Sequence, residues 1–434
     1  MKRLLVKSLT AVALVAGFVS CATAADVIWS GTTGSYTDAT QWDGGAVPTA
    51  EDTAKIGSGA TVSLTGSDEQ NAKNVYVGYV ENDSVAAQFL FSGLLRVNDT
   101  FLLGQTQGSA GAVEQTGGAL TTVVGHDPSF SIGYQKDGGN GAVSTYKLSD
   151  GSITVTAGTG HVGSFGNGIF EMSGGTFTIS SWFVLAWQAG SSGTMDLSGG
   201  TLTQTSAGQG LIIGEHGTAS LTVRDNGVVE NVGRLSMNGN SSITVKNGGR
   251  LTAAFLARQN NDGDNPVITL DGGTLTMTGT TKVRGDYFPA FTTTTIGTGG
   301  ATLEIPKDYQ ATVAQPFGGS GGLTKTGQGT LTLTGDSTYT GPTRVREGAL
   351  FLATPTTIPS LANLTLDAGT TLGVRSDAGW SMEAFTQTII PKVLATPNAN
   401  LGIDTTVQDV TYDMDLTFPN GGGLVKAGKN KLTL

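Results

Sequence analysis

The chain has 434 residues, of which 66 are glycine and 13% are charged. Glycine is about twice as frequent as in average proteins and helix formers are scarce, which excludes a helical bundle. A formal net charge of −10 argues against nucleic-acid binding, because phosphates require a basic surface. Glycine-rich sequence can be disordered, but the regular spacing of apolar residues described below predicts a folded chain.

The N-terminus is predicted to be a signal peptide over residues 1–24. A basic start precedes the apolar run 9–19, which is shorter than the ~20 residues of a membrane-spanning helix. The run leads to Ala22-Thr23-Ala24, the small-x-small pattern that signal peptidase accepts. A lipoprotein signal ending at Cys21 is the disfavoured alternative. Export would remove Cys21, the only cysteine, and no membrane span is expected in the mature chain.

Residues 25–65 are expected to form an N-terminal cap and the first coil of a repetitive structure. Trp29, Tyr36 and Trp42 give this segment a high aromatic density, which suits a cover over an exposed core. The rival interpretation is a carbohydrate-binding platform built on the same three rings.

Residues 66–280 are predicted to be glycine-rich repeats of about 24 residues. A glycine turn followed by an alternating run recurs, and the last glycines of these turns are Gly93, Gly118, Gly151, Gly175, Gly200, Gly227, Gly249 and Gly273. One interval is long, and its extra residues around 136–141 have loop composition. Recurrence at a fixed period indicates a repeat architecture rather than a single globular core.

The run before each turn alternates between apolar and polar residues, as in a half-buried strand. The predicted inward positions are Val113, Gln115, Tyr146, Leu148, Phe170, Met172, Met195, Leu197, Ile268 and Leu270. Two units shift this pattern by one residue, which predicts longer turns. A further strand follows each turn, and a third, ending in glycine, opens many units.

These units predict an all-β fold: a right-handed parallel β-helix (β-solenoid) with three short strands per coil of about 24 residues. Short strands cannot bury their apolar sides alone, but stacked coils can, at a spacing of ~4.8 Å. A β-sandwich is the competing architecture, because its turns recur at similar intervals. The recurrence of the pattern after every three strands favours the solenoid.

The solenoid is expected to continue over residues 281–434, where a second pattern appears. Residues 321–335, followed by 337–343 and 347–350, resemble the autotransporter-associated β-strand repeat, which we place at 318–352. Residues 421–434 resemble the opening of a second, incomplete copy. The resemblance implies an exported passenger-type β-solenoid, secreted or at the surface of a Gram-negative-type bacterium. A chain that stops within a repeat is expected to self-associate through its last strand.

Few residues of the sequence are arranged in a way that suggests a binding or catalytic site. The best candidate is an outward ladder of Glu114, Lys147, Glu171 and Asp196, which either is a solvated face or holds a ligand. The histidines, His126, His161 and His216, are isolated and predicted to lie in loops. Exposed aromatic residues, including Trp182 and Trp187, could instead bind sugars. No catalytic, cofactor or metal-binding residue is assigned.

The predicted function is therefore an exported structural or adhesive passenger that displays loops at the cell surface and is not an enzyme. The alternative is a parallel β-helix that binds or degrades polysaccharide, because such sites need convergent carboxylates on one face. Cell-surface or extracellular polysaccharide is the expected partner.

Overall fold

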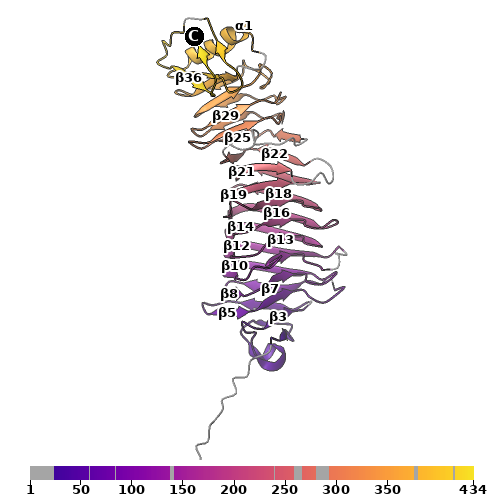
Figure 1. Ribbon diagram of the computed structural model, residues 1–434. Helices are drawn as coiled ribbons and strands as arrows, with labels where there is room; N and C mark the ends of the chain where they lie inside the picture. Colours follow the sequence, from indigo (N-terminus) through magenta and orange to yellow (C-terminus); the bar gives the residue numbers. More distant parts are fainter. Residues whose placement is uncertain are drawn as a thin grey trace, which may run out of the picture.

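The computed structural model describes residues 24–434 with the exception of 58, 84, 137–140, 239, 259–265, 280–292, 376–379 and 414–415. The predicted signal peptide and Cys21 lie outside the described residues, as does most of the predicted loop at 136–141. The described chain winds into coils that stack in an elongated column (Figure 1).

Each coil contributes strands to three faces of the column, here called the first, second and third face in chain order. The strands of the first face are β1 (Asp26–Ile28), β3 (Thr53–Ile56), β6 (Asn74–Val77), β9 (Phe101–Leu103), β11 (Phe130–Ile132), β13 (Gly160–Val162), β15 (Phe183–Leu185) and β17 (Gly210–Ile213). Those of the second face are β2 (Thr33–Ser35), β4 (Thr61–Leu64), β7 (Ala87–Phe91), β18 (Thr218–Arg224), β20 (Ser241–Lys246), β22 (Val267–Asp271), β24 (Thr293–Ile296) and β27 (Gly318–Gly319). Those of the third face are β5 (Glu69–Ala72), β8 (Leu94–Val97), β23 (Gly273–Met277), β25 (Ala301–Glu304), β28 (Leu323–Thr326), β30 (Thr343–Val345) and β32 (Leu364–Leu366).

Several long strands bend at a corner of the column, so that each belongs to two faces. The second and third faces share β10 (Gly111–Thr122), β12 (Val143–Val155), β14 (Asn167–Ile179) and β16 (Ser192–Gln204), and the third and first faces share β19 (Val228–Met237) and β21 (Arg250–Arg258). Each strand pairs in parallel with its copy in the next coil. The predicted parallel β-solenoid is confirmed.

Towards the C-terminus the strands form two further parallel sheets. One contains β26 (Gln310–Val313), β29 (Thr330–Leu333), β31 (Ala349–Leu352), β33 (Thr371–Arg375), β34 (Asn400–Asp404) and β36 (Leu424–Ala427), and the other contains β35 (Val410–Thr411) and β37 (Leu432–Thr433). The segments on either side of the undescribed residues 280–292 therefore both continue the coil pattern.

Four of the eight marker glycines lie at the corner where one continuous strand bends from the second face to the third. Gly118, Gly151, Gly175 and Gly200 all have positive φ, and register shifts flank this position in β10 and β14. A left-handed residue lets the strand bend without leaving the ladder, because glycine has no Cβ to clash. The two shifted units do have true turns there, with Asp225 (φ 56) and Asn247 (φ 50) in the left-handed region.

The core is a column of inward side chains. All ten predicted inward positions are buried, and the rings of Phe101 and Phe130 stack at 5.9 Å between adjacent coils. Phe170 and Phe177 extend this aromatic column from the second and third faces. Even the polar Gln115 lies inside, where it accepts a hydrogen bond from the Tyr146 hydroxyl at 2.6 Å. Burial raises the pKa of Tyr146 well above its usual value.

The first face departs from the alternating pattern, because its outward residues are buried as well. The middle residues of successive strands, Leu102, Ser131, His161, Val184 and Ile212, are all buried. His161, for example, contacts Ser164 and Trp187, which follow the strands of its own and the next coil. A simple inward–outward alternation therefore fails in these strands, and β33 and β34 also carry four consecutive buried residues.

Trp29, Tyr36 and Trp42 close the N-terminal end of the core. Their rings pack edge to face at 5.1 Å, and the Trp42 indole N–H donates to the Tyr36 carbonyl at 2.7 Å. The 3-10 turns η1 (Ala39–Gln41) and η2 (Asp43–Gly45) flank Trp42. Because all three rings are buried, the sugar-platform interpretation of this trio is wrong.

A short helical insertion between β33 and β34 was not predicted. It consists of α1 (Met382–Ala384), the π-helical turn η3 (Phe385–Ile389) and α2 (Ile390–Ala395), close to the C-terminus (Figure 1). Phe385, Ile389 and Val393 recur every four residues and are buried, so one side of the insertion packs on the core. The Asn420 amide donates to the carbonyls of Val393 and Thr396 and thereby ties the end of the insertion to the following coil.

Candidate functional site: a polar groove on the second face

The predicted outward ladder is continuous in the structure. Glu114 pairs in register with Lys147, Lys147 with Glu171, and Glu171 with Asp196. The four side chains therefore occupy the same position in consecutive coils of β10, β12, β14 and β16, one strand spacing of ~4.8 Å apart. Sequence periodicity alone identified this arrangement correctly.

The ladder is largely compensated in charge. The Lys147 amine lies 3.3 Å from the Glu171 carboxylate, and Arg224, two residues beyond the ladder position in β18, lies 3.0 Å from the carboxylate of Asp196. Arg224 also pairs with Asp225 at 2.6 Å. These contacts are solvent-exposed and contribute little to folding stability. They do place a cation beside each of the neighbouring carboxylates Glu171 and Asp196.

Two depressions lie along this ladder and meet at Glu114 and Lys147. The first, of about 340 Å³, is lined also by Gln88, Leu90 and Thr145. The second, of about 390 Å³, reaches past Glu171 and Asp196 to Arg224, and Ser149, Ser173 and Ser198 line its other side. The two depressions adjoin at Glu114 and Lys147 and follow each other along the solenoid axis, and together they are here called the second-face groove.

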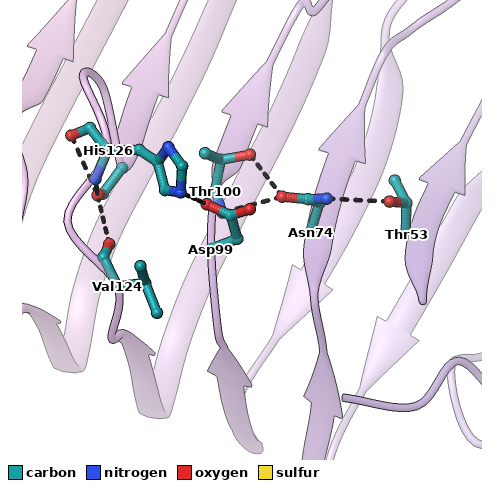
Figure 2. Close-up of polar contacts among 7 residues, drawn as sticks. Thr53, Asn74, Asp99, Thr100, Val124 and His126 are labelled. Carbon is teal, nitrogen blue, oxygen red and sulfur yellow. Dashed lines mark hydrogen bonds and ion pairs between the residues drawn. The ribbon is translucent and has the colours of Figure 1, made fainter. Parts of the chain in front are cut away.

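A second row of polar side chains follows the corner between the third and first faces (Figure 2). The Asn74 amide donates to the Thr53 hydroxyl at 3.0 Å and accepts from the Thr100 hydroxyl at 2.9 Å. In the next coil the His126 ring lies 2.5 Å from the Asp99 carboxylate. The row ties one coil to the next, and His126 lies in a loop as predicted.

The sequence predicted His161 to lie in a loop, and this prediction is wrong. The residue lies in the middle of β13. Its Nδ1 lies 3.0 Å from the Ser164 hydroxyl, and its Nε2 lies 3.4 Å from the Asp127 carboxylate. The His161 contact lowers the pKa of Asp127. Ser164 is 0% exposed and its hydroxyl also contacts Ser131 at 2.7 Å, so no substrate can reach it. This Ser–His–Asp arrangement is a structural network and not a nucleophilic site.

The two predicted sugar-binding tryptophans are half-buried and in contact with protein. Trp182 lies under the Arg234 guanidinium at 5.0 Å from its ring centroid. Trp187 packs against His161 and Phe165 at 5.1 and 5.2 Å. Phe165 in turn contacts Tyr134, so the three aromatic rings form a row across consecutive coils. Packing accounts for both tryptophans.

Lys325, in the segment that resembles the passenger repeat, is buried inside the solenoid, which sequence reasoning missed. It is 1% exposed, and its amine donates to the carbonyls of Thr326, Gly327 and Glu347 at 2.9, 2.6 and 3.0 Å. Burial lowers the pKa of Lys325 to about 8. The signal was present in the alternation, because Leu323 and Lys325 share the inward side of β28.

In the part of the chain that the structure describes, no group of three or more His, Cys, Asp or Glu side chains is arranged to hold a metal ion. No described helix is both long and apolar enough to cross a membrane.

Residues 323–350 match the family model of the passenger-associated-transport-repeat. Over these residues the chain is similar to a passenger repeat. It is also 28% identical over 284 residues to an adhesin named BmaC autotransporter from Brucella suis biovar 1, and the alignment covers 57% of this chain and 8% of that protein. The chain thus spans a small fraction of the relative's length. No solved structure matches the chain.

These matches agree with the resemblance noted in the sequence. The passenger repeat lies inside the predicted boundaries 318–352, and it forms β28, β29, β30 and part of β31 of the solenoid. Recognition as a passenger-type β-solenoid is confirmed, and a secreted or cell-surface location in a Gram-negative-type bacterium is supported. Neither matching name includes a catalytic activity.

Proposed function

We propose that the chain is an exported adhesive passenger segment whose outer faces contact other surfaces and which catalyses no reaction. The observation that carries the proposal is the passenger repeat at 323–350, stacked in register on the preceding coils through β25 and β28. The name of the adhesin relative supports the same function. A rigid column extends binding surfaces away from the cell, because each coil adds ~4.8 Å of height.

Adhesion of coated beads tests this function. Beads carrying the purified chain are flowed over surfaces coated with extracellular polysaccharide or bacterial envelope, and retention is measured against beads carrying heat-unfolded chain. The proposal expects retention that depends on the fold, with no new reducing ends or unsaturated sugars in the eluate. Absence of retention on every surface, or release of sugar products, would contradict it.

A further inference from the structure

The second-face groove has a shape that suits an extended polymer. It spans β7, β10, β12, β14, β16 and β18, so its length runs along the solenoid axis and not across it. Successive coils present a charged side chain at the ladder position and a serine, Ser149, Ser173 or Ser198, beside it. A ligand made of repeating units can therefore meet the same kind of contact several times in succession.

Two parallel rows of hydrogen-bonding groups line the groove. One is the ladder from Glu114 to Asp196, and the other consists of Ser149, Ser173 and Ser198, each one residue beyond a buried apolar position. The Ser149 hydroxyl donates to the Gln115 carbonyl of the previous coil at 3.2 Å, which leaves its oxygen free to accept. Lys147 and Arg224 add donors. The groove therefore offers both donors and acceptors at close intervals.

The charges of the lining favour a neutral polymer over a strongly anionic one. Lys147 and Arg224 stand against Glu114, Glu171 and Asp196, so the lining carries a formal charge of −1. Lys147 and Arg224 are already engaged with carboxylates, whereas Glu114 has no cationic partner among the described contacts. A polyanion would approach an unpaired carboxylate without a compensating positive field.

A peptide strand is disfavoured for a different reason. The main-chain groups of β12, β14 and β16 pair with their neighbours along the ladder, so the groove floor offers no free strand edge. Contacts must come from side chains. Leu90, which is 39% exposed at one end of the groove, adds an apolar surface of the kind that packs against a sugar ring.

We propose that the second-face groove binds a linear, neutral polysaccharide whose chain runs parallel to the solenoid axis. This inference rests on the proposed adhesive function and names its ligand class and its site. Glu114 and Glu171 accept hydrogen bonds from sugar hydroxyls, Lys147 donates to ring or hydroxyl oxygens, and the serines complete the opposite wall. Binding breaks no covalent bond.

The test measures binding of soluble neutral oligosaccharides of increasing length by calorimetry. Linear β-glucan, mannan and galactan fragments are the probes, and polygalacturonate and alginate are the acidic comparators. The proposal expects affinity to rise with chain length until the groove is filled, and to be weaker for both acidic polymers. Stronger binding of either acidic polymer would overturn it.

The paired variants locate the site. Glu114→Gln combined with Glu171→Gln removes two charged acceptors at exposed positions and should weaken binding at least about tenfold. Glu230→Gln makes one substitution of the same kind on the outward side of the third face and should leave binding unchanged. Thermal unfolding confirms that all variants fold. Equal affinity in the groove variant and the wild type would place the site elsewhere and overturn the proposal.

The two proposals fail separately. If coated beads adhere to envelope surfaces but no neutral oligosaccharide binds, the groove assignment is wrong while the adhesive function stands. If neutral oligosaccharides bind through the groove but the beads adhere to nothing, the adhesive function is wrong while the groove assignment stands.

Discussion

The two copies of the passenger-type motif share their local geometry but differ in their surroundings. In the first, the Lys325 amine donates to the carbonyl of Gly327 at 2.6 Å, and in the second, Lys426 donates to the carbonyl of Gly428 at 2.8 Å. Both glycines have positive φ, 72° and 79°. Only Lys325 also reaches the next coil, at the Glu347 carbonyl, and only Lys325 is buried.

The copies also lie in different sheets. β28 of the first copy pairs with β25 and β30 on the third face, whereas β36 of the second pairs with β34 in the six-stranded sheet. The motif therefore encodes a lysine whose amine donates to the carbonyl of the glycine two residues later. Neighbouring coils decide whether that lysine becomes part of the core.

Replacing each lysine in turn should show the difference between the two copies most clearly. Lys325→Met removes the amine that donates to carbonyls inside the solenoid, and we expect it to lower the free energy of unfolding by about 2–4 kcal/mol at pH 9. Lys426→Met, at an exposed position, should change it by less than about 0.5 kcal/mol. Urea unfolding checks both; similar losses in the two variants would show that burial is not the deciding difference.

The burial of Lys325 should also make the free energy of unfolding depend on pH. Its pKa is lowered by burial to about 8 from 10.5, so between these values the unfolded chain holds a proton that the folded chain has released. The free energy of unfolding therefore rises with pH through this window, by up to about 3 kcal/mol, and Lys325→Met lacks this rise. Unfolding measured from pH 7 to 11 should show the gap between wild type and variant widening. A constant gap would contradict the shifted pKa.

Two glycines with positive φ, Gly327 inside the repeat and Gly369 outside it, allow the cost of backbone strain to be measured separately from the cost of a close contact. A Cβ at Gly327 would lie 2.2 Å from the Ile305 carbonyl oxygen, whereas at Gly369, which also has positive φ, it would meet nothing within 4 Å. Gly327→Ala should therefore cost about 2–3 kcal/mol and Gly369→Ala only about 1 kcal/mol. Thermal unfolding of the pair measures the difference, and equal losses would mean that the contact relaxes.

Gly428 provides the matching test in the second copy. Its Cβ would lie 2.2 Å from the Thr406 nitrogen, so Gly428→Ala is strained too. A coil at the end of the column can detach alone, because solenoid coils contact only their neighbours. We expect faster proteolysis of the C-terminal residues without a shift of the main unfolding midpoint.

The smallest expected effect concerns the second half of the repeat. The Tyr339 hydroxyl contacts the Thr343 hydroxyl at 2.5 Å in the core, and burial raises the pKa of Tyr339 to about 12. Tyr339→Phe should lower the free energy of unfolding by about 1 kcal/mol, because Thr343 keeps an unpaired hydroxyl. The double variant Tyr339→Phe with Thr343→Val should recover part of that loss; a larger loss would assign Thr343 another role.

Much of the column could be predicted because its order is local and repeated. The spacing of Gly118, Gly151, Gly175 and Gly200 gave the coil period, since each bend needs a residue that tolerates positive φ. Alternation gave the inward residues of the second and third faces, because a strand shows one side to the core. The ladder from Glu114 to Asp196 followed from the same periodicity.

The remaining features depend on contacts between segments far apart in the chain. His161 is buried against Ser164 and Trp187, which follow the strands of its own and the next coil, and no pattern within β13 encodes these contacts. The depressions that join at Glu114 and Lys147 exist only because six coils align. The sequence by itself therefore determined the coil and its inward side, where the physics is local. Only the tertiary structure decided which polar residues became core and which became groove, since burial is a property of neighbours.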